Sequence, residues 1–454
     1  MGIYKFIRKI FKANFNKNIF YIITIAITTA FIFNLINIST NKYIDNEVVY
    51  SYEGTYIDAN GEIQEYGDKL SPAAGMGPTL LLLVGITCFF SAFCNGKHIR
   101  RKGNELAFIL SNGGSLVDLA RYLVFTNGCC YLIGAGLGVV LGIGSTPIFN
   151  GIIYWISGIN APLFVCEFSY VWLTLLYIAV QYFAIVTLNF GYAYRNEVID
   201  LIKSDNTKNF IDKRNVRTPG FLFFIIYLTP IMLTIWISKI KGGEIAIYFV
   251  AYLGLIGLYG TIKYFIPKII ILLKKKKFMF KNNRIIYVSN FMNSLSKSIV
   301  YLIAMSICFN NQIYSVVGTY DIPVFNAMAI FGIVITSMVV GATLIYSLFV
   351  DSEDRIPTYN QMRILGYNKK EIGKIIYKEA GLFFTLGILL SLIIQFCTLF
   401  IYVVTNSIPF ELGLKIAVFI TMPFLLIGTI SAIINKRKVI KAIYEESSSN
   451  LIIV

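Results

Sequence analysis

Apolar residues along the chain gather in long runs that are separated by short polar segments. A run of about 20 such residues forms an α-helix long enough to cross the roughly 30 Å hydrocarbon core of a bilayer. The pattern predicts ten spans, at residues 19–38, 74–96, 122–145, 169–191, 220–238, 245–265, 299–317, 326–349, 379–404 and 413–433. We therefore predict an all-α fold, that of a polytopic membrane protein with about ten transmembrane helices.

The segment before the first span, IYKFIRKIFKANFNKN, combines basic and apolar residues in the pattern of a helix that lies on a membrane surface. The span after it is long and lacks a small-residue cleavage signal. We therefore expect a retained span and not a signal peptide.

Composition and charge agree with a membrane location. The 454 residues are 56% hydrophobic and carry a formal net charge of +16. The basic residues lie in short segments between spans, so the positive-inside rule explains them more simply than nucleic-acid binding does. With the N-terminus in the cytoplasm, about 35 of the 40 Lys and Arg residues lie on that side. The sequence thus predicts a multi-pass protein of the cell membrane with both termini cytoplasmic and no nucleic-acid partner.

Two segments between spans have an unusual charge. The loop 40–71, expected outside, has seven acidic residues against Lys42 and Lys69. Its tyrosines could contact a cationic peptide, or the loop could simply be solvated. The run from Lys274 to Lys277 could bind anionic membrane lipids, although positive-inside anchoring is the simpler explanation.

No residue pattern points to a reaction carried by this chain itself. The seven cysteines lie mostly within apolar runs without zinc spacing, and His98 lies in a basic segment where we expect a solvated loop residue. We therefore expect no metal site. No P-loop motif occurs, so we expect no ATP site in this chain and no cofactor of its own. Glu379, the main carboxylate near a span, is expected at the cytoplasmic end of span nine, near Lys378 and Arg363.

The sequence contains an internal duplication. A shift of 253 residues superimposes Gly113 on Gly366, Gly128 on Gly381 and Gly134 on Gly387. A shift of 280 residues aligns NKNIFYIITIAI with SKSIVYLIAMSI, and the segment YRNEVIDLIK resembles NKRKVIKAIY. The repetition predicts three parts: residues 1–215 form a first four-span unit, 216–280 two linking spans and a basic loop, and 281–454 a second four-span unit. Units with four spans each keep one orientation, so an axis along the membrane normal should relate them.

Two polar segments at equivalent places in the repeats are the sharpest functional feature. In GNELAFILSNGGSLVDLARYLVF and PTYNQMRILGYNKKEIGKIIYKEAG, apolar residues at helical spacing alternate with charge, and a glycine interrupts each segment. Each segment could lie on the membrane. Two equivalent protrusions also suit a cytoplasmic partner with two-fold symmetry, one protrusion for each partner subunit.

Glycines in the spans indicate close helix packing. Gly134, Gly138 and Gly142 recur at every fourth position of YLIGAGLGVVLGIG, which places them on one helix face. Gly381 and Gly387 lie in the matching part of the second repeat. We expect neighbouring helices to approach these faces closely.

The order of these parts resembles that of FtsX-like ABC transporter permeases, also called the MacB or type VII family. The resemblance is carried by Glu105-Leu-Ala-Phe-Ile-Leu with Gly113 and Leu119, and by its twin Arg363-Ile-Leu-Gly366-Tyr-Asn with Glu371-Ile372. The arrangement of four, two and four spans is similar to that of the Bce-type (bacitracin-resistance type) permeases of Gram-positive bacteria.

The resemblance implies that the two polar segments are coupling helices, which dock on a separate cytoplasmic ABC ATPase, present in two copies, that binds the ATP. The coupling residues implied are Glu105, Leu110, Gly113, Leu116, Leu119, Arg363, Leu365, Gly366, Lys370 and Ile372. The family further implies export, membrane extraction or mechanotransmission involving an amphiphilic peptide or lipid-linked ligand, and resistance to antimicrobial peptides.

One departure from the Bce type affects the expected function. Such permeases carry a large extracellular domain between spans seven and eight, whereas this chain has only a short segment near Thr319 to Val324. An alternative is therefore a non-transporting membrane adaptor that relays ATPase motion to a cell-wall enzyme or a sensor histidine kinase. An ion-coupled transporter is disfavoured because buried charge is scarce in the spans.

Overall fold

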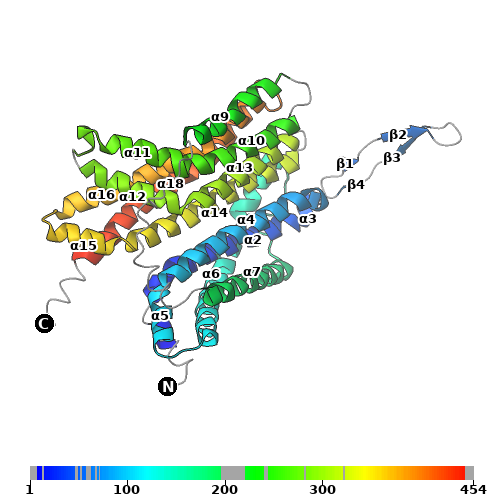
Figure 1. The fold of residues 1–454 in the computed structure, drawn as a ribbon. Helices are drawn as coiled ribbons and strands as arrows, with labels where there is room; N and C mark the ends of the chain where they lie inside the picture. The colour runs from blue at the N-terminus through cyan, green and yellow to red at the C-terminus, as the bar shows by residue number, and fades with distance from the viewer. Residues whose placement is uncertain are drawn as a thin grey trace. The chain divides into compact units, whose positions relative to one another are not determined.

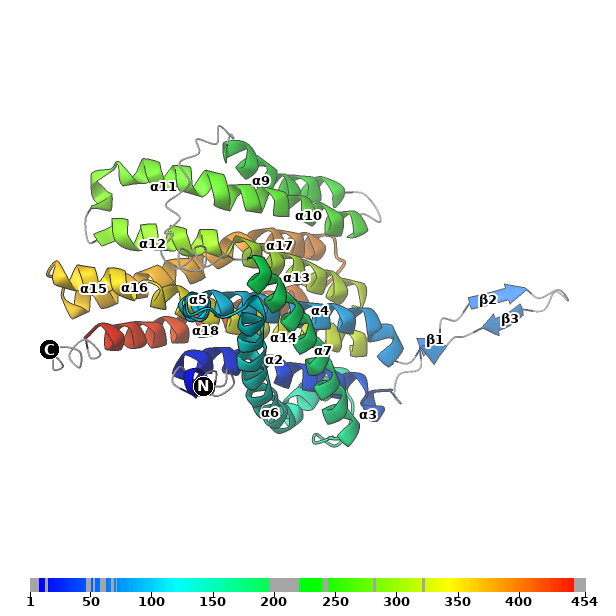
Figure 2. The same cartoon turned by 60° about the horizontal axis from the view of Figure 1, so that its bottom comes forward.

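The computed structural model describes residues 8–12, 15–45, 50–51, 54–57, 63–66, 69–70, 72–195, 220–239, 244–280, 283–320 and 323–444. This part of the chain is mostly α-helical (Figures 1 and 2), and ten of its helices are long and apolar enough to cross a membrane. Each overlaps one of the ten spans predicted from the apolar runs. The chain is an all-α polytopic membrane protein, as predicted.

Most of the long helices extend past the apolar runs into the polar segments. In chain order they are α2 (Phe15–Ser39), α4 (Pro72–Arg101), α6 (Leu116–Ser157), α7 (Phe168–Arg195), α9 (Gly220–Ile237), α10 (Glu244–Gly260), α13 (Ile299–Gly318), α14 (Pro323–Glu353), α17 (Ile388–Val404) and α18 (Phe410–Tyr444). Short helices are α3 (Lys42–Asp45), α5 (Gly103–Ser111), α11 (Ile266–Lys274), α12 (Arg284–Lys297), α15 (Ile356–Ile364) and α16 (Lys369–Leu382). π-helical turns at Thr261–Phe265 and Phe383–Gly387 join α10 to α11 and α16 to α17, and a 3₁₀ turn covers Lys277–Met279.

The acidic loop contains strands that the apolar pattern did not predict. β1 (Tyr50–Ser51) pairs antiparallel with β4 (Lys69–Leu70), and β2 (Gly54–Ile57) pairs antiparallel with β3 (Ile63–Tyr66). The register places Gly54 opposite Tyr66 and Ile57 opposite Ile63.

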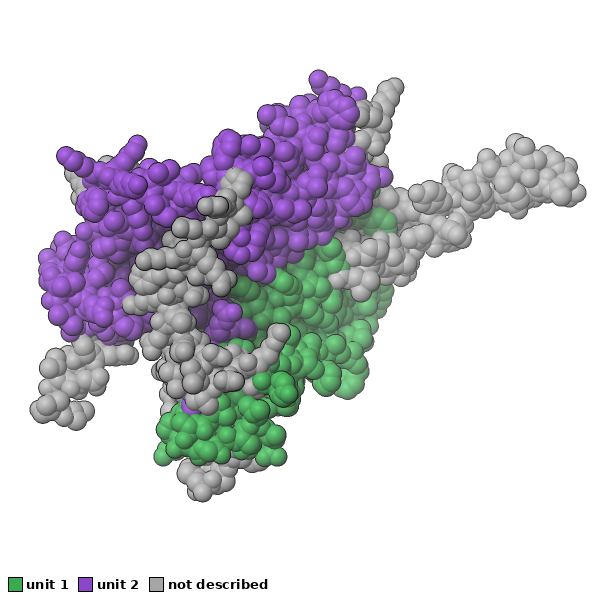
Figure 3. All heavy atoms as spheres, viewed as in Figure 1, with its two compact units in different colours: residues 1–95, 108–197, 318–335 green, residues 96–107, 198–317, 336–454 purple. Residues whose placement is uncertain are grey.

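The helices form two compact units, coloured separately in Figure 3. Unit 1 comprises residues 1–95, 108–197 and 318–335, and unit 2 comprises 96–107, 198–317 and 336–454. Several predictions fall partly on residues outside the described set: the N-terminal amphipathic segment, the acidic loop, and the segment YRNEVIDLIK, with Val198 and Ile199. The division into parts 1–215, 216–280 and 281–454 stays a prediction.

Unit 1 is organised around the contact of α2 with α6. A Cβ atom added at Gly134 would lie 2.7 Å from Ile25 Cγ2, and one at Gly138 would lie 2.7 Å from the Ala26 backbone oxygen. At Gly142 it would lie 2.9 Å from Phe33 Cβ. These distances are too short for any side chain, so glycine lets the two helices touch at this face.

Asparagines continue the same α2–α6 contact towards the loop end. Asn34 Nδ2 donates to Ser145 Oγ at 2.9 Å, Asn37 Nδ2 to Asn150 Oδ1 at 3.1 Å, and Asn41 Nδ2 to the Tyr154 hydroxyl at 2.7 Å. Interhelical hydrogen bonds of this kind add to packing where no water competes.

The matching glycines of the second repeat are less crowded. A Cβ atom at Gly387 would lie 3.4 Å from Leu295 Cδ1, which is close contact, whereas no heavy atom lies within 4 Å of one at Gly381.

Candidate functional site

Two helix–turn–helix segments occupy equivalent places in the repeats. We call residues 103–123 the first elbow and residues 356–376 the second elbow. The first consists of α5, a turn and the start of α6, and the second of α15, a turn and the start of α16. Each helix boundary in one elbow lies 253 residues from its counterpart in the other, the shift that superimposes Gly113 on Gly366. The repeat seen in the sequence therefore extends to backbone structure.

The turns of both elbows require glycine. Gly113 has φ +80° and Gly366 has φ +95°, a left-handed conformation that costs side-chain-bearing residues energy. In each turn the residue after the glycine donates its N–H five residues back: Gly114 to the Ile109 oxygen at 3.0 Å, and Tyr367 to the Met362 oxygen at 3.1 Å. This is the Schellman ending of a helix, which accounts for the glycine in each repeat.

The second helix of each elbow begins with a capping box. Ser115 caps α6 and exchanges hydrogen bonds with Asp118, and Asn368 caps α16 and does the same with Glu371. Such reciprocal bonds satisfy N–H groups that the first helical turn leaves without partners. The sequence thus fixes where each elbow turns back.

Burial separates the ten predicted coupling residues into anchors and surface. Leu119 and Ile372 are fully buried and hold the elbows to the rest of the protein. Exposed residues are Gly113, Leu116, Leu365, Gly366 and Lys370, while Glu105, Leu110 and Arg363 are half-buried. The exposed members gather around the glycine turns.

The second elbow rests on an apolar core of unit 2. The core contains Tyr359, Met362, Ile372, Ile375, Ile376, Val439 and Ile443, so the elbow packs on the C-terminal end of α18. Arg363 Nη1 donates to the Ile443 backbone oxygen at 2.5 Å, and its guanidinium lies 5.4 Å from the centre of the Tyr444 ring. The base of this elbow is therefore firmly seated while its turn is exposed.

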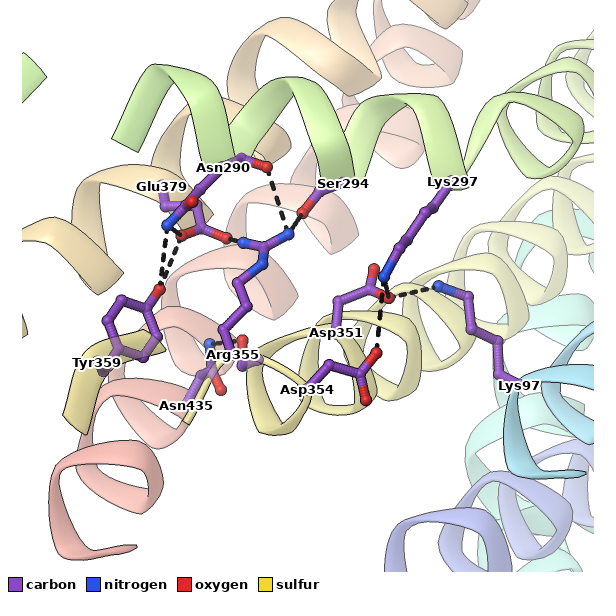
Figure 4. A network of polar contacts seen from close by, with 11 residues as sticks. Lys97, Asn290, Ser294, Lys297, Asp351, Asp354, Arg355, Tyr359, Glu379 and Asn435 are labelled. Atoms are coloured by element: carbon purple, nitrogen blue, oxygen red, sulfur yellow. Dashed lines mark hydrogen bonds and ion pairs between the residues drawn. The ribbon is translucent and has the colours of Figure 1, made fainter. Parts of the chain in front are cut away.

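A charged hub joins α14 to the second elbow. We call residues 351–355, Asp-Ser-Glu-Asp-Arg, the DSEDR hub; Figure 4 shows most of its contacts. Asp351 accepts from Lys97 Nζ of α4 at 2.9 Å and lies 4.0 Å from Lys297 Nζ of α12, which also lies 3.6 Å from Asp354. Three helices thus meet through two aspartates.

The rest of the hub reaches α4, α18, α12 and α16. Glu353 forms ion pairs with Arg101 and Lys438, and Asn435 Nδ2 donates to Ser352 Oγ at 2.7 Å. Arg355 binds the Glu379 carboxylate and donates to Ser294 Oγ at 2.6 Å. The end of α14 is therefore connected to α4, α12, α16 and α18.

Polar side chains complete the surroundings of Glu379. The Tyr359 hydroxyl donates to Glu379 Oε2 at 3.0 Å, and Asn290 Nδ2 donates to the same oxygen at 2.9 Å. Burial raises the pKa of the Tyr359 phenol, so it stays a neutral donor at physiological pH. The sequence placed Glu379 near Lys378 and Arg363 but missed Arg355.

The hub also joins the two repeats at equivalent positions. The 253-residue shift superimposes the basic segment 98–102 on the acidic segment 351–355. Arg101 and neighbouring Lys97 bind hub carboxylates directly. Opposite charge at matching span ends thus holds the two ends together.

The basic segment was expected to be a solvated loop, and this is wrong. His98 is buried in the last turn of α4, and Lys97 and Lys102 are also buried. The helix continues past the apolar run to Arg101, and the ion pairs of Lys97 and Arg101 compensate the charge of its basic end. Within the described residues, no three His, Cys, Asp or Glu side chains could hold a metal ion.

The hub is the functional candidate that sequence reasoning missed. Its signal was present: five polar residues, four of them charged, directly follow a long apolar span that ends at Val350. The partners lie far away in sequence, however, and no local pattern links Asp351 to Lys97.

Similarity to known proteins covers the second elbow and the hub. Residues 330–442 match the family model described as FtsX-like permease C-terminal. No curated protein matches the chain. The FtsX-like region runs from within α14 to near the end of α18, and it contains the hub and all of the second elbow.

The FtsX-like match supports the similarity of this chain to FtsX/MacB-type permeases. It suggests a membrane subunit of an ABC-type transporter, a class that generally lacks its own nucleotide site and works with a cytoplasmic ATPase. The matched region contains the hub with its partners on α16 and α18, whereas Lys97 of α4 and Ser294 of α12 lie outside it.

Proposed function

We propose that the chain couples ATP hydrolysis by a separate ATPase to export, membrane extraction or mechanotransmission, acting on an amphiphilic peptide or lipid-linked ligand as Bce-type resistance permeases do. The observation that carries the proposal is the second elbow: it lies within the FtsX-like region, its turn is exposed, and its backbone is repeated in the first elbow. A transporter with two equivalent elbows can bind a pair of ATPase subunits, one at each elbow.

The elbows are the coupling helices in this proposal. Exposed residues at the glycine turns contact the ATPase, and the buried Leu119 and Ile372 transfer its push to the helices behind them. From the second elbow, movement passes along α16 and its π turn into α17, a continuous helical path from Lys369 to Val404. ATP is bound by the partner, and two ATPase copies serve the two elbows.

The hub provides a second route for the movement. Arg355 begins the elbow and binds α16 and α12, while Asp351 and Glu353 bind α4 and α18. A displacement of α15 therefore reaches four helices through direct polar contacts. Charged contacts of this kind have defined geometry and can switch between discrete arrangements.

The proposed topology places both elbows and both termini in the cytoplasm of a bacterium, and the loop that contains Cys166 outside the cell. The lysines and arginines near the elbows and hub support this side, because cytoplasmic segments are enriched in them. We infer a Gram-positive plasma membrane from the Bce-type arrangement of spans.

A second candidate is an adaptor that relays ATPase motion without transporting a ligand. It is favoured by the short connection between α13, which ends at Gly318, and α14, which begins at Pro323. The adaptor would act on a cell-wall enzyme or a sensor histidine kinase. Efflux and antibiotic-protection assays, run with and without the kinase, separate the two candidates: a transporter moves ligand in both settings, and an adaptor in neither.

The deciding experiment is copurification with candidate ABC ATPases, followed by ATPase and protection assays of a Gly366→Pro variant. Proline cannot adopt φ +95°, so the second elbow loses its turn. Gly158→Pro is the matched control, because Gly158 also has positive φ, at +73°, but ends α6 far from the elbows in sequence. We expect ATPase binding and protection to be reduced only in Gly366→Pro, in which the first elbow still has its turn. Failure of every ATPase to copurify, or full binding and protection by Gly366→Pro, contradicts the coupling role.

A further inference from the structure

The two elbows have the same backbone but present different surfaces. Around the turn of the first elbow, the polar pair Ser111 and Asn112 precedes the glycines and the apolar pair Leu116 and Val117 follows them. In the second elbow the order is reversed. The apolar pair Ile364 and Leu365 comes first, and Lys369 and Lys370 follow.

The apolar pair of the second elbow is much more exposed. Ile364 and Leu365 are 82% and 78% exposed, against 45% and 57% for Leu116 and Val117. Adjacent large apolar side chains that are this exposed outside the spans mark a candidate interaction surface.

The two elbows also differ in net charge. The second elbow contains four basic residues, Arg363, Lys369, Lys370 and Lys374, against one acidic residue, Glu371. The first contains one basic residue, Arg121, against Glu105 and Asp118, and Arg121 lies 3.4 Å from Asp118. An acidic partner surface therefore attracts the second elbow and not the first.

The position of the second turn favours a protein surface over lipid head groups. The polar part of α16 extends from Lys369 to Lys378, and the predicted apolar run begins at residue 379. At 1.5 Å per helical residue, about 15 Å of polar helix separates the turn from that run. The exposed Ile364 and Leu365 lie at the far end of this polar helix.

We propose that the second elbow is the dominant docking handle: it binds a groove of the ATP-binding subunit that has an acidic rim and an apolar pocket for Ile364 and Leu365. The first elbow binds the equivalent groove of the second copy more weakly, because it lacks the basic rim and its apolar pair is less exposed. This inference rests on the proposed function and adds to it the chemistry of the partner's groove and the order of binding.

The test uses the full-length chain in lipid nanodiscs and the ABC ATP-binding subunits of the source genome, each purified and titrated singly. Surface plasmon resonance measures the association rate at low and high salt, and native mass spectrometry measures how many copies bind. Lys369→Glu/Lys370→Glu should slow association about tenfold and remove most of its salt dependence. The control Lys275→Glu/Lys276→Glu makes the same change in net charge at exposed lysines outside the elbows and should leave both unchanged.

Transferring the surface residues of the second elbow to the first tests whether the two elbows bind the same kind of groove. Ser111→Ile, Asn112→Leu, Leu116→Lys and Val117→Lys transfer the second surface to exposed positions of the first elbow. The unmodified chain should fill with ATPase in two distinct steps, and the grafted chain should bind two copies with equal affinity. Loss of the second copy on grafting overturns the inference, because the elbows would then need different grooves.

The remaining outcomes separate this inference from the proposed function. An unchanged association rate in Lys369→Glu/Lys370→Glu overturns the inference and leaves the ATPase partnership standing. A charge effect that appears only when the nanodiscs contain phosphatidylglycerol assigns the basic elbow to lipid and overturns it as well. If no ATP-binding subunit binds the unmodified chain, the proposed function itself fails.

Discussion

The guanidinium of Arg355 forms a buried ion pair with the carboxylate of Glu379. This pair fastens the first turn of the second elbow to α16. Ser294, Asn290 and Tyr359 surround it with further hydrogen bonds. Because both charges are shielded from solvent, each depends on the other for compensation.

Removing one member of this pair should be much more damaging than removing both. Arg355→Met leaves the Glu379 carboxylate buried without its partner, and we expect the free energy of unfolding to fall by about 3–5 kcal/mol. Arg355→Met/Glu379→Leu replaces both charges with apolar groups and should recover most of that loss. Thermal unfolding of the detergent-solubilised protein measures this. Equal losses in the single and double variants would show that the pair itself is not what stabilises the elbow.

The two aspartates of the hub provide a matched comparison. Asp351 is buried between Lys97 and Lys297, whereas the side chain of Asp354 is 43% exposed and lies 3.6 Å from Lys297 Nζ. Asp354→Asn should therefore cost about 0–1 kcal/mol, as for surface ion pairs generally. Asp351→Asn leaves the Lys97 ammonium buried beside a neutral amide and should cost several times more in the same unfolding assay. A similar loss in both variants would mean that burial does not set the strength of these contacts.

The spans and the elbow turns could be predicted from the sequence because each depends on residues that are close together in the chain. Apolar run length marks a span, and Gly366 followed by Asn368 and Glu371 marks a helix end and a new start. Repetition strengthened each signal, since Gly113, Ser115 and Asp118 occupy the same places in the first repeat.

The hub could not be predicted from the sequence because its ion-pair partners lie far apart along the chain. The positive-inside rule places Lys97 on the cytoplasmic side, but only the fold brings its Nζ to 2.9 Å from Asp351 Oδ1. The end of α4 has the same kind of distant contact, since Arg101, its last residue, binds Glu353. A charged residue next to a span can thus be exposed to solvent or form an ion pair with a residue distant in sequence. The local sequence does not distinguish these two environments.

Glycines on the face of α6 that contacts α2 should not tolerate a side chain, whereas a glycine on an open face of α6 should. Gly138 and Gly136 lie two residues apart on one helix, but a Cβ at Gly138 would lie 2.7 Å from the Ala26 backbone oxygen, and nothing lies within 4 Å of one at Gly136. Gly138→Val should cost about 1–3 kcal/mol of stability through overpacking. Gly136→Val changes the same residue type and should leave thermal stability nearly unchanged. Equal melting temperatures for the two variants would contradict the close packing.

Cys166 reports which side of the membrane the loop between α6 and α7 faces. It is an exposed free cysteine, and the proposed topology places it outside the cell, whereas Cys94, Cys130 and Cys308 are buried. A membrane-impermeant maleimide should therefore label intact cells, and Cys166→Ser should abolish that labelling. Partial burial raises the pKa of the Cys166 thiol above its ordinary value, so the reactive thiolate is scarcer at neutral pH. The labelling rate should consequently continue to rise with pH beyond the range in which a fully solvated cysteine has become fully ionised. Labelling only after the membrane is permeabilised would reverse the orientation, and the elbows would then face away from any cytoplasmic ATPase.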